Sequence, residues 1–345
     1  MEALSRARGA LYGLAVGDAL GMPTQLLSRA EIRDRWGPLL PGFEAAPPGH
    51  PIAAGLPAGA VTDDTEQAVL LARLLVRGHG TVDPRELATA LVNWERDMAE
   101  RGSLDLLGPS TKRAVAAVLA GVPPEETGAA GATNGAAMRI APLGVAFPVT
   151  QRQLSMLVDY VVRVSSVTHN TGIALAGAAA VAAAVSAGVS GAGIAEATAL
   201  AIEAARIAAD RGHWVAGADV AARIEWAASL VAGREQAEAA ELIYTLVGTS
   251  LATQESVPAA FAVLAAVPDD PWQACLLAAS LGGDCDTIAA MAGAVAGACH
   301  GVDAFPADAI AMIDAQGLGL ATLADDLYAL RSQPDVARAL SKGAP

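Results

Sequence analysis

The chain is 345 residues long, carries a formal net charge of −14 at pH 7, and is 53% hydrophobic but only 4% aromatic. Nucleic-acid binding needs clustered Lys and Arg, so this charge argues against DNA and RNA as partners while still allowing a small nucleotide-like ligand. Residue clusters typical of strands are scarce, and Ala is abundant. The composition therefore predicts an all-α protein whose small side chains let helices pack closely.

Apolar residues recur at helical spacing along most of the chain. They predict helices over residues 3–21, 65–77, 84–99, 111–119, 152–167, 192–211, 217–231, 235–247, 256–266, 272–279 and 288–299, with two terminal helices within 305–340. The uncharged run 172–195 is long enough to span a membrane. It consists mostly of Ala, Gly and Ser, so we expect a buried core helix with a turn near 188–191, and no membrane contact.

The Pro- and Gly-rich segment 38–59 shows no regular pattern. Long irregular loops inside compact domains are usually functional, and this one leads directly into an acidic cluster, so we expect a lid or a site wall. We expect His50, His79 and His213 to be solvated because they lie in polar loops. The spacing Gly293-x-x-x-Gly297 predicts close contact between helix backbones.

The three cysteines are Cys275, Cys285 and Cys299. Their number is odd, they lack C-x-x-C spacing, and they lie in apolar helical runs. This pattern predicts free thiols in a reducing compartment. The N-terminal residues show no cleavage pattern for secretion, so we expect a cytoplasmic protein.

A first acidic cluster, Thr62-Asp63-Asp64-Thr65-Glu66, comes directly before an apolar helical run. Taken alone, Asp63-x-x-Glu66 is typical of a capping box, and carboxylates at a helix start suit the positive end of the dipole. Two adjacent Asp residues are nevertheless more than capping requires.

A second cluster, Gly282-Gly283-Asp284-Cys285-Asp286-Thr287, also begins an apolar helix. Buried carboxylates repel one another and must be protonated, paired or bound to a metal. Asp and Thr oxygens, without a cysteine pair or His-x-x-x-His nearby, favour Mg²⁺, Ca²⁺ or Mn²⁺ over zinc. Together the two clusters predict a metal site that can hold two ions about 4 Å apart.

Three further patches leave two interpretations open. Asp105 is either a solvated loop residue or a site carboxylate. The Asn134-Gly135 turn either starts a helix or presents the N–H groups of Gly135 and Ala136 to an anion or a sugar oxygen. His169 at a helix junction is either structural or part of a ligand pocket.

The two acidic clusters lie more than two hundred residues apart. If they share ions, residues 1–300 cannot form two independent domains. No repeat of 20–50 residues suggests a solenoid. We therefore expect one domain over residues 1–345.

The motifs taken together resemble those of the ADP-ribosylglycohydrolase family. The resemblance covers roughly residues 8–301, in order, through Gly17-Asp18-Ala19-Leu20-Gly21, Thr62-Asp63-Asp64, Asn134-Gly135-Ala136-Ala137-Met138-Arg139, Thr168-His169, Glu255-Ser256-Val257-Pro258 and Gly282-Gly283-Asp284-Cys285-Asp286-Thr287. Each motif is weak alone, whereas six in the same order are specific.

The resemblance implies a compact all-α fold with two Mg²⁺ ions in a central cleft, and Mn²⁺ as an alternative ion. It implies the metal ligands Thr62, Asp63, Asp64, Asp284, Asp286 and Thr287. It also implies an ADP-ribose pocket lined by Asn134, Gly135, Ala136, Met138, Arg139, Thr168 and His169. From the chemistry of the metal site, we expect Asp284 to be the base that takes a proton from water. Asp105 resembles the family's further site carboxylate, and we expect it to help orient water or the leaving group.

One position departs from the family pattern. Members that act on ADP-ribosylated proteins often have Glu shortly after the Gly-Asp-Ala motif, whereas this chain has Gln25. Gln25 can bind substrate or metal through its carbonyl oxygen, but it cannot act as a base.

These features favour a Mg²⁺-dependent glycohydrolase that removes ADP-ribose from a side chain or a small conjugate. One alternative keeps the metal site but cleaves free nucleosides or other small ribosides. Another is an inactive relative that serves a structural role or only binds ADP-ribose. We expect a monomer or a weak homo-oligomer.

Overall fold

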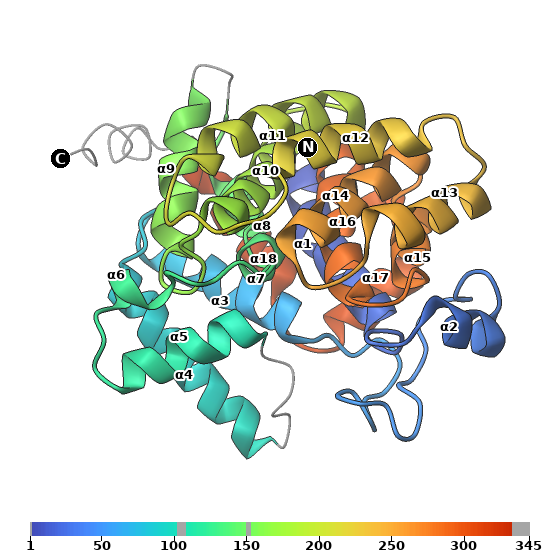
Figure 1. The fold of residues 1–345 in the computed structure, drawn as a ribbon, viewed down its shortest axis with the longest axis horizontal. Helices are drawn as coiled ribbons and strands as arrows, with labels where there is room; N and C mark the ends of the chain where they lie inside the picture. Colours follow the sequence, from blue (N-terminus) through green and yellow to red (C-terminus); the bar gives the residue numbers. More distant parts are fainter. Residues whose placement is uncertain (1, 102–107, 150–152, 333–345) are drawn as a thin grey trace.

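The computed structural model describes residues 2–101, 108–149 and 153–332, and within these ranges the chain is helical with no strand (Figure 1). The elements are α1 (Glu2–Gly21), α2 (Arg29–Trp36), α3 (Asp63–Arg77), α4 (Pro84–Glu100), α5 (Pro109–Leu119), α6 (Pro124–Thr127), α7 (Gly135–Met138), α8 (Ala141–Ala146), α9 (Leu154–Ser165), α10 (Gly172–Val189), α11 (Ile194–Ala209), α12 (Val220–Val231), α13 (Gln236–Leu242), the π-helix η2 (Ile243–Val247), α14 (Thr253–Ala266), α15 (Pro271–Ala279), α16 (Cys285–His300), the 3₁₀-helix η3 (Val302–Ala304), α17 (Ala307–Asp314) and α18 (Leu320–Leu330). The prediction of an all-α fold is confirmed.

The helices predicted from apolar spacing all form, and their ends differ from the prediction by a few residues. Two of these differences affect the candidate site. Helix α3 begins at Asp63 and α16 begins at Cys285, so both acidic clusters lie on or directly before the first helical turn. Periodicity detects the apolar part of a helix and misses a polar first turn.

Helices α1 and α16 lie against each other because glycines remove the side chains between them. A Cβ atom at Gly13 would lie 2.1 Å from the carbonyl oxygen of Gly293, and one at Gly17 would lie 2.0 Å from that of Ala289. Further along, a Cβ atom at Gly21 would lie 2.2 Å from the Cα atom of Asp286. The close contact expected from Gly293-x-x-x-Gly297 is confirmed, and it brings the end of α1 up to the second acidic cluster.

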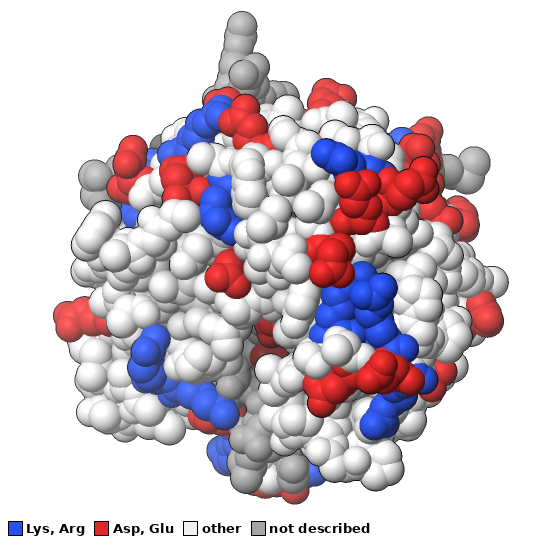
Figure 2. All heavy atoms as spheres, turned by 45° about the vertical axis from the view of Figure 1, so that its right-hand side comes forward, with Lys and Arg blue, Asp and Glu red and all other residues white. Residues whose placement is uncertain are grey.

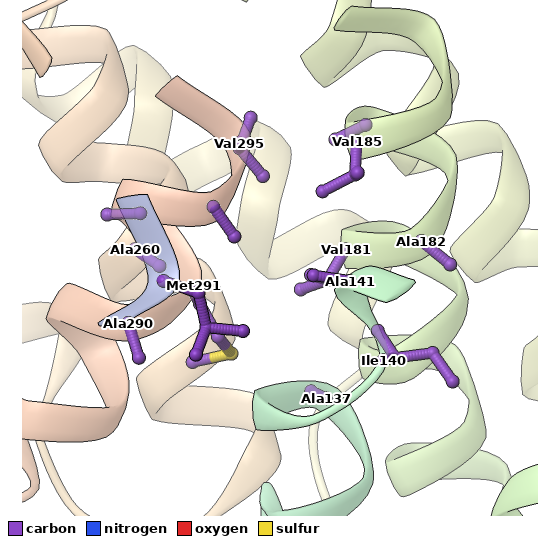
Figure 3. Close-up of a cluster of buried hydrophobic side chains, with 14 of the residues drawn as sticks. Ala137, Ile140, Ala141, Val181, Ala182, Val185, Ala260, Ala290, Met291 and Val295 are labelled. Carbon is purple, nitrogen blue, oxygen red and sulfur yellow. The ribbon is translucent and has the colours of Figure 1, made fainter. Parts of the chain in front are cut away.

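Helix α10 is a core helix. It is long and apolar enough to cross a membrane, yet 89% of its apolar window is buried inside the protein. Figure 3 shows Val181 and Val185 of α10 facing Met291 and Val295 of α16 across the interior, with the α7–α8 segment beside them. Burial inside the protein therefore accounts for the apolar character of this helix.

The irregular segment 38–59 packs back onto the end of α1. Ala46 and Ala53 are buried against Met22, and the Ala46 N–H donates to the Leu56 carbonyl oxygen at 3.1 Å. The expectation that His50 is solvated is wrong, because its side chain is buried in this segment and both ring nitrogens are hydrogen-bonded. The Pro- and Gly-rich sequence around it gave no sign of this burial, which arises where the segment packs beside Met22 and Gln25, just after α1.

Acidic and basic side chains lie beside each other on the face shown in Figure 2. Near the middle of this face, acidic atoms are recessed within a largely uncharged surface. The basic side chains on this face form separate groups with acidic side chains beside them.

Candidate active site

The N-termini of α3 and α16 meet at the end of α1. The Thr287 hydroxyl of α16 donates to Asp64 Oδ2 of α3 at 3.2 Å. One carboxylate oxygen from each of Asp18, Asp64 and Asp286 lies within 4.8 Å of the other two, and all three residues are buried. The two acidic clusters that the sequence separates are therefore brought into one site.

Asp18 binds the first turn of α3. Its carboxylate accepts hydrogen bonds from the Thr62 N–H at 2.9 Å, the Thr62 hydroxyl at 2.7 Å and the Thr65 N–H at 3.1 Å. Asp18 thus supplies the capping contacts, and the capping box of Asp63 with Glu66 does not form. Instead, Glu66 accepts hydrogen bonds from Trp94 and Arg101.

Asp18 was absent from the site residues inferred from the sequence. The available signal was an ionisable residue near the end of a glycine-spaced apolar helix, where an unpaired buried carboxylate is costly. We place it with the site because all four hydrogen bonds to its carboxylate come from Thr62 and Thr65, at the start of α3.

A chain of hydrogen bonds leads from Asp63 into the protein interior. Gln67 Nε2 donates to Asp63 Oδ2 at 3.0 Å, and Arg139 Nη1 donates to Gln67 Oε1 at 2.8 Å. Arg139 Nη2 in turn donates to the Thr168 hydroxyl. The guanidinium is fully enclosed behind the carboxylates, and burial lowers its pKa to about 10.

His169 continues this chain. Because the Thr168 hydroxyl accepts from Arg139, its own proton is free to go to His169 Nδ1, which lies 2.7 Å away. His169 Nε2 then donates to the Thr133 hydroxyl at 2.9 Å. Burial, followed by the charges of Arg139 and Arg113, holds the pKa of His169 well below its usual value, so the ring is neutral.

Asp284 lies at the start of α16 and is half-buried. Its carboxylate accepts a hydrogen bond from Asn134 Nδ2, and the same amide nitrogen donates to the Ser256 hydroxyl at 3.0 Å. The Asp284 N–H donates to the Thr249 carbonyl oxygen at 2.7 Å. The Asn-Gly turn and the Glu255-Ser256 motif therefore meet at this carboxylate.

The carboxylates of the site form a cluster whose full ionisation is energetically unfavourable. The cluster consists of Asp18, Asp63, Asp64, Asp284 and Asp286. Burial raises the pKa values of Asp63, Asp64 and Asp286 well above the usual range, and repulsion between the carboxylates raises them further. Burial also raises the pKa of Asp284, although hydrogen bonds from Asn134 and Thr287 work against this, and it raises that of Asp18 to about 6.

Asp64 Oδ1 and Asp286 Oδ1 are buried and have no hydrogen-bond partner in the described chain. Unpaired buried carboxylate oxygens are rare, and they fit a bound cation. The surrounding donors are carboxylate and hydroxyl oxygens, which suit a hard divalent ion. The Cys285 thiol contributes little, because it lies 3.3 Å from the Thr24 hydroxyl and burial raises its pKa.

The cluster opens into a cavity of about 180 Å³. Its described lining residues are Gln25, Leu26, Ile52, Asp63, Gly108, Pro109, Thr111, Thr133, Asn134, Gly135, Met138, Leu251, Asp284, Asp286 and Thr287. Eight of the predicted substrate or metal residues line this cavity: Gln25, Asp63, Asn134, Gly135, Met138, Asp284, Asp286 and Thr287. Ile52 comes from the segment 38–59, as expected for a site wall.

Other predicted residues lie behind this lining. They are buried and are not among the described lining residues: Thr62, Asp64, Ala136, Arg139, Thr168 and His169. Asp105 lies outside the described residues, so its assignment stays a prediction. A larger cavity of about 670 Å³ lies between α3, α4 and the start of α18, and the carboxylate cluster does not line it.

The sequence model of the family described as ADP-ribosylglycohydrolase matches residues 1–336. The chain belongs to the ADP-ribosylglycohydrolase family. The members of this family are hydrolases that cleave glycosidic bonds, so the resemblance inferred from six ordered motifs is confirmed.

Relatives of this ADP-ribosylglycohydrolase span nearly its whole length. The uncharacterized protein YegU of Escherichia coli K12 is 37% identical over 311 residues, covering 90% of this chain and 92% of that protein. ADP-ribosylarginine hydrolase Tri1 of Pseudomonas putida is 31% identical, covering 99% and 83%. A solved structure titled ADP-ribosylglycohydrolase-related protein complex superposes with a TM-score of 0.66 at 26% identity, covering 95% of this chain and 99% of that one.

Proposed function

We propose that this protein is a Mg²⁺-dependent hydrolase that removes ADP-ribose from a side chain or a small conjugate, using a site for two ions. The observation that carries the proposal is the pair of unpartnered buried oxygens, Asp64 Oδ1 and Asp286 Oδ1, where two helix N-termini meet under a cavity. Similarity to an ADP-ribosylarginine hydrolase supports the ADP-ribosyl part.

In this proposal Asp63, Asp64, Asp284 and Asp286 hold the ions together with the hydroxyls of Thr62 and Thr287. Each hydroxyl donates its proton to a carboxylate, Thr62 to Asp18 and Thr287 to Asp64, which leaves oxygen lone pairs for a cation. When bound, Mg²⁺ supplies Lewis acidity and positive charge for ribose hydroxyls and water. Mn²⁺ has the same preference for oxygen ligands and would substitute for it.

Hydrolysis breaks the bond between the anomeric carbon and the leaving nitrogen or oxygen, through a state that resembles an oxocarbenium ion. The oxygen of water joins the carbon. We assign Asp284 as the group that takes the proton from this water and returns it to the leaving group. Its hydrogen bond to Asn134 suits that exchange, because it keeps the carboxylate oriented.

A second candidate, hydrolysis of nucleosides or other small ribosides, is favoured by the uncharged cavity mouth. Gln25, Leu26, Ile52 and Leu251 line it, and Leu26 and Leu251 are 51% and 40% exposed. No Lys or Arg occurs among the described lining residues, so a diphosphate would depend on backbone N–H groups and the ions.

The test is a substrate panel of ADP-ribosyl-arginine, ADP-ribosyl-serine and free nucleosides, each assayed with Mg²⁺ and with chelator. We expect ADP-ribose release that chelator abolishes. Asp284→Asn should lower kcat by on the order of a hundredfold or more, the usual effect of losing a catalytic base. The control Asp269→Asn, which removes a carboxylate from an exposed loop, should retain full activity.

Turnover that persists in chelator would contradict the metal mechanism. Turnover of nucleosides alone would favour the second candidate.

A further inference from the structure

We propose that His50 is a positioning residue that holds the two sides of the cavity mouth together. This inference rests on the proposed function, because the mouth is taken to contact substrate. His50 lies in the segment 38–59 and is not itself among the described residues that line the cavity. Its two ring nitrogens instead reach backbone groups on each side of the mouth.

One nitrogen fixes a turn. His50 Nδ1 lies 2.9 Å from the Ala53 N–H nitrogen and 3.3 Å from that of Ile52. Backbone N–H groups can only donate, so Nδ1 carries no proton and accepts. This contact shapes residues 50–53 and presents Ile52 to the cavity.

The other nitrogen reaches the opposite wall. Since Nδ1 is unprotonated, the proton of the neutral ring is on Nε2, which donates to the Gln25 carbonyl oxygen at 2.9 Å. The N–H of the same peptide unit, contributed by Leu26, donates to the Gly283 carbonyl oxygen at 2.7 Å. The peptide between Gln25 and Leu26 is therefore held from both sides, by His50 and by the residue before Asp284.

The backbone at this peptide is strained. Leu26 has φ +61°, a left-handed conformation that L-residues other than Gly seldom adopt. Strained backbone persists only where surrounding contacts hold it, and it clusters at ligand sites. The His50 and Gly283 hydrogen bonds are such contacts, and they keep Gln25 and Leu26 facing the cavity.

His50 thus connects segment 50–53 through the Gln25–Leu26 peptide to Gly283. The connection pre-orders both walls of the mouth, and a binding site that is already ordered loses less entropy when it binds. Loss of the connection should therefore raise KM. The value of kcat should change little, because Asp284 is held independently by Asn134 and Thr249.

Two variants separate the two hydrogen-bonding roles. His50→Ala removes both contacts. His50→Asn keeps the turn, because an Asn side-chain oxygen accepts from the N–H groups two and three residues on, but it is too short to reach Gln25. Both variants lose the hydrogen bond to Gln25. The net free energy of one hydrogen bond corresponds to a factor of about five, so we expect KM to rise about fivefold in both, with kcat within about twofold of wild type.

His79→Asn is the matched control, since His79 is exposed at the far end of α3, and its KM should equal that of wild type. An unchanged KM in His50→Asn, with the enzyme folded and active, would overturn the role of His50. A drop in kcat with KM constant would also overturn it, because it would place His50 in the chemistry.

A measurement without substrate separates this inference from the proposed function. Within segment 38–59, the Ala46 N–H donates a hydrogen bond to the Leu56 carbonyl oxygen. The hydrogen-exchange rate of the Ala46 N–H therefore reports release of this segment from α1. We expect exchange in His50→Asn at least about fivefold faster than in wild type, and unchanged exchange would contradict the connection. If no riboside is turned over, the proposed function fails, and the exchange result alone decides whether His50 connects the two walls.

Discussion

The Thr287 hydroxyl donates to Asp64 Oδ2 at 3.2 Å, although 223 positions separate the two residues. This bond joins the first turn of α16 to the first turn of α3. It leaves Asp64 Oδ1 and Asp286 Oδ1 buried without partners in the described chain. The same contact therefore brings the carboxylates together and leaves two oxygens available for a cation.

Replacing Asp286 by Asn tests this arrangement by direct metal binding. Asn keeps an oxygen but removes the charge, so we expect the affinity for Mg²⁺, measured by calorimetry, to fall at least about tenfold, or 1.4 kcal/mol. Without metal the variant should be no less stable than wild type, because one source of repulsion among buried carboxylates is gone. The exposed Asp269→Asn is the control, and equal Mg²⁺ affinity in the two variants would exclude Asp286 as a ligand.

Replacing Gly13 by Ala tests the contact that aligns α1 with α16. The new Cβ atom would meet the Gly293 carbonyl oxygen at 2.1 Å, so the helices must separate. We expect the free energy of unfolding, from chemical denaturation, to fall by about 3 kcal/mol, despite the better helix propensity of Ala.

Gly193→Ala is the control for this substitution. A Cβ atom there meets nothing within 4 Å, so its stability should stay within about 0.5 kcal/mol of wild type. Equal stability of the two variants would show that the α1–α16 contact is looser than described.

The buried carboxylates predict how stability depends on pH in the absence of metal. Burial raises the pKa of Asp18 from 3.8 to about 6, so between these values the native state holds a proton that the unfolded state has lost. Stability therefore decreases as pH rises through this window. Relative to Asp18→Asn, the free energy of unfolding of wild type in chelator should fall by up to roughly 3 kcal/mol from pH 4 to pH 7.

Equilibrium denaturation of both proteins at several pH values measures this difference. Added Mg²⁺ should restore stability at pH 7, since bound cations favour the charged carboxylates. A difference that is constant with pH, or that increases towards pH 7, would contradict the raised pKa.

Most of the helices could be predicted from the sequence because apolar periodicity is a local property. The burial of α10 followed from its Ala-rich composition, and Gly293 with Gly297 indicated close packing. The two acidic clusters could be recognised because each combines adjacent or alternating carboxylates with an apolar helix. Their order among other motifs was enough to identify the family.

Contacts between distant residues could not be predicted in the same way. Asp18 is far in sequence from the threonines that bind it, and Arg139 is enclosed behind the site where a basic residue was expected to face the ligand. His50 lies in an irregular Pro- and Gly-rich stretch of the sequence, and its ring is buried in the structure. The burial and the partners of these three side chains depend on which distant segment of the chain packs against them.

The sequence by itself thus determined the helices, the oxygen-rich helix starts and the family, because these depend on residues that are neighbours along the chain. Only the tertiary structure decided that Asp64 and Asp286 share one buried space, that Asp18 supports them, and that His50 connects the two walls of the mouth. These relationships arise where glycines let α1 and α16 approach to backbone contact. Such contact brings side chains together regardless of their separation in sequence.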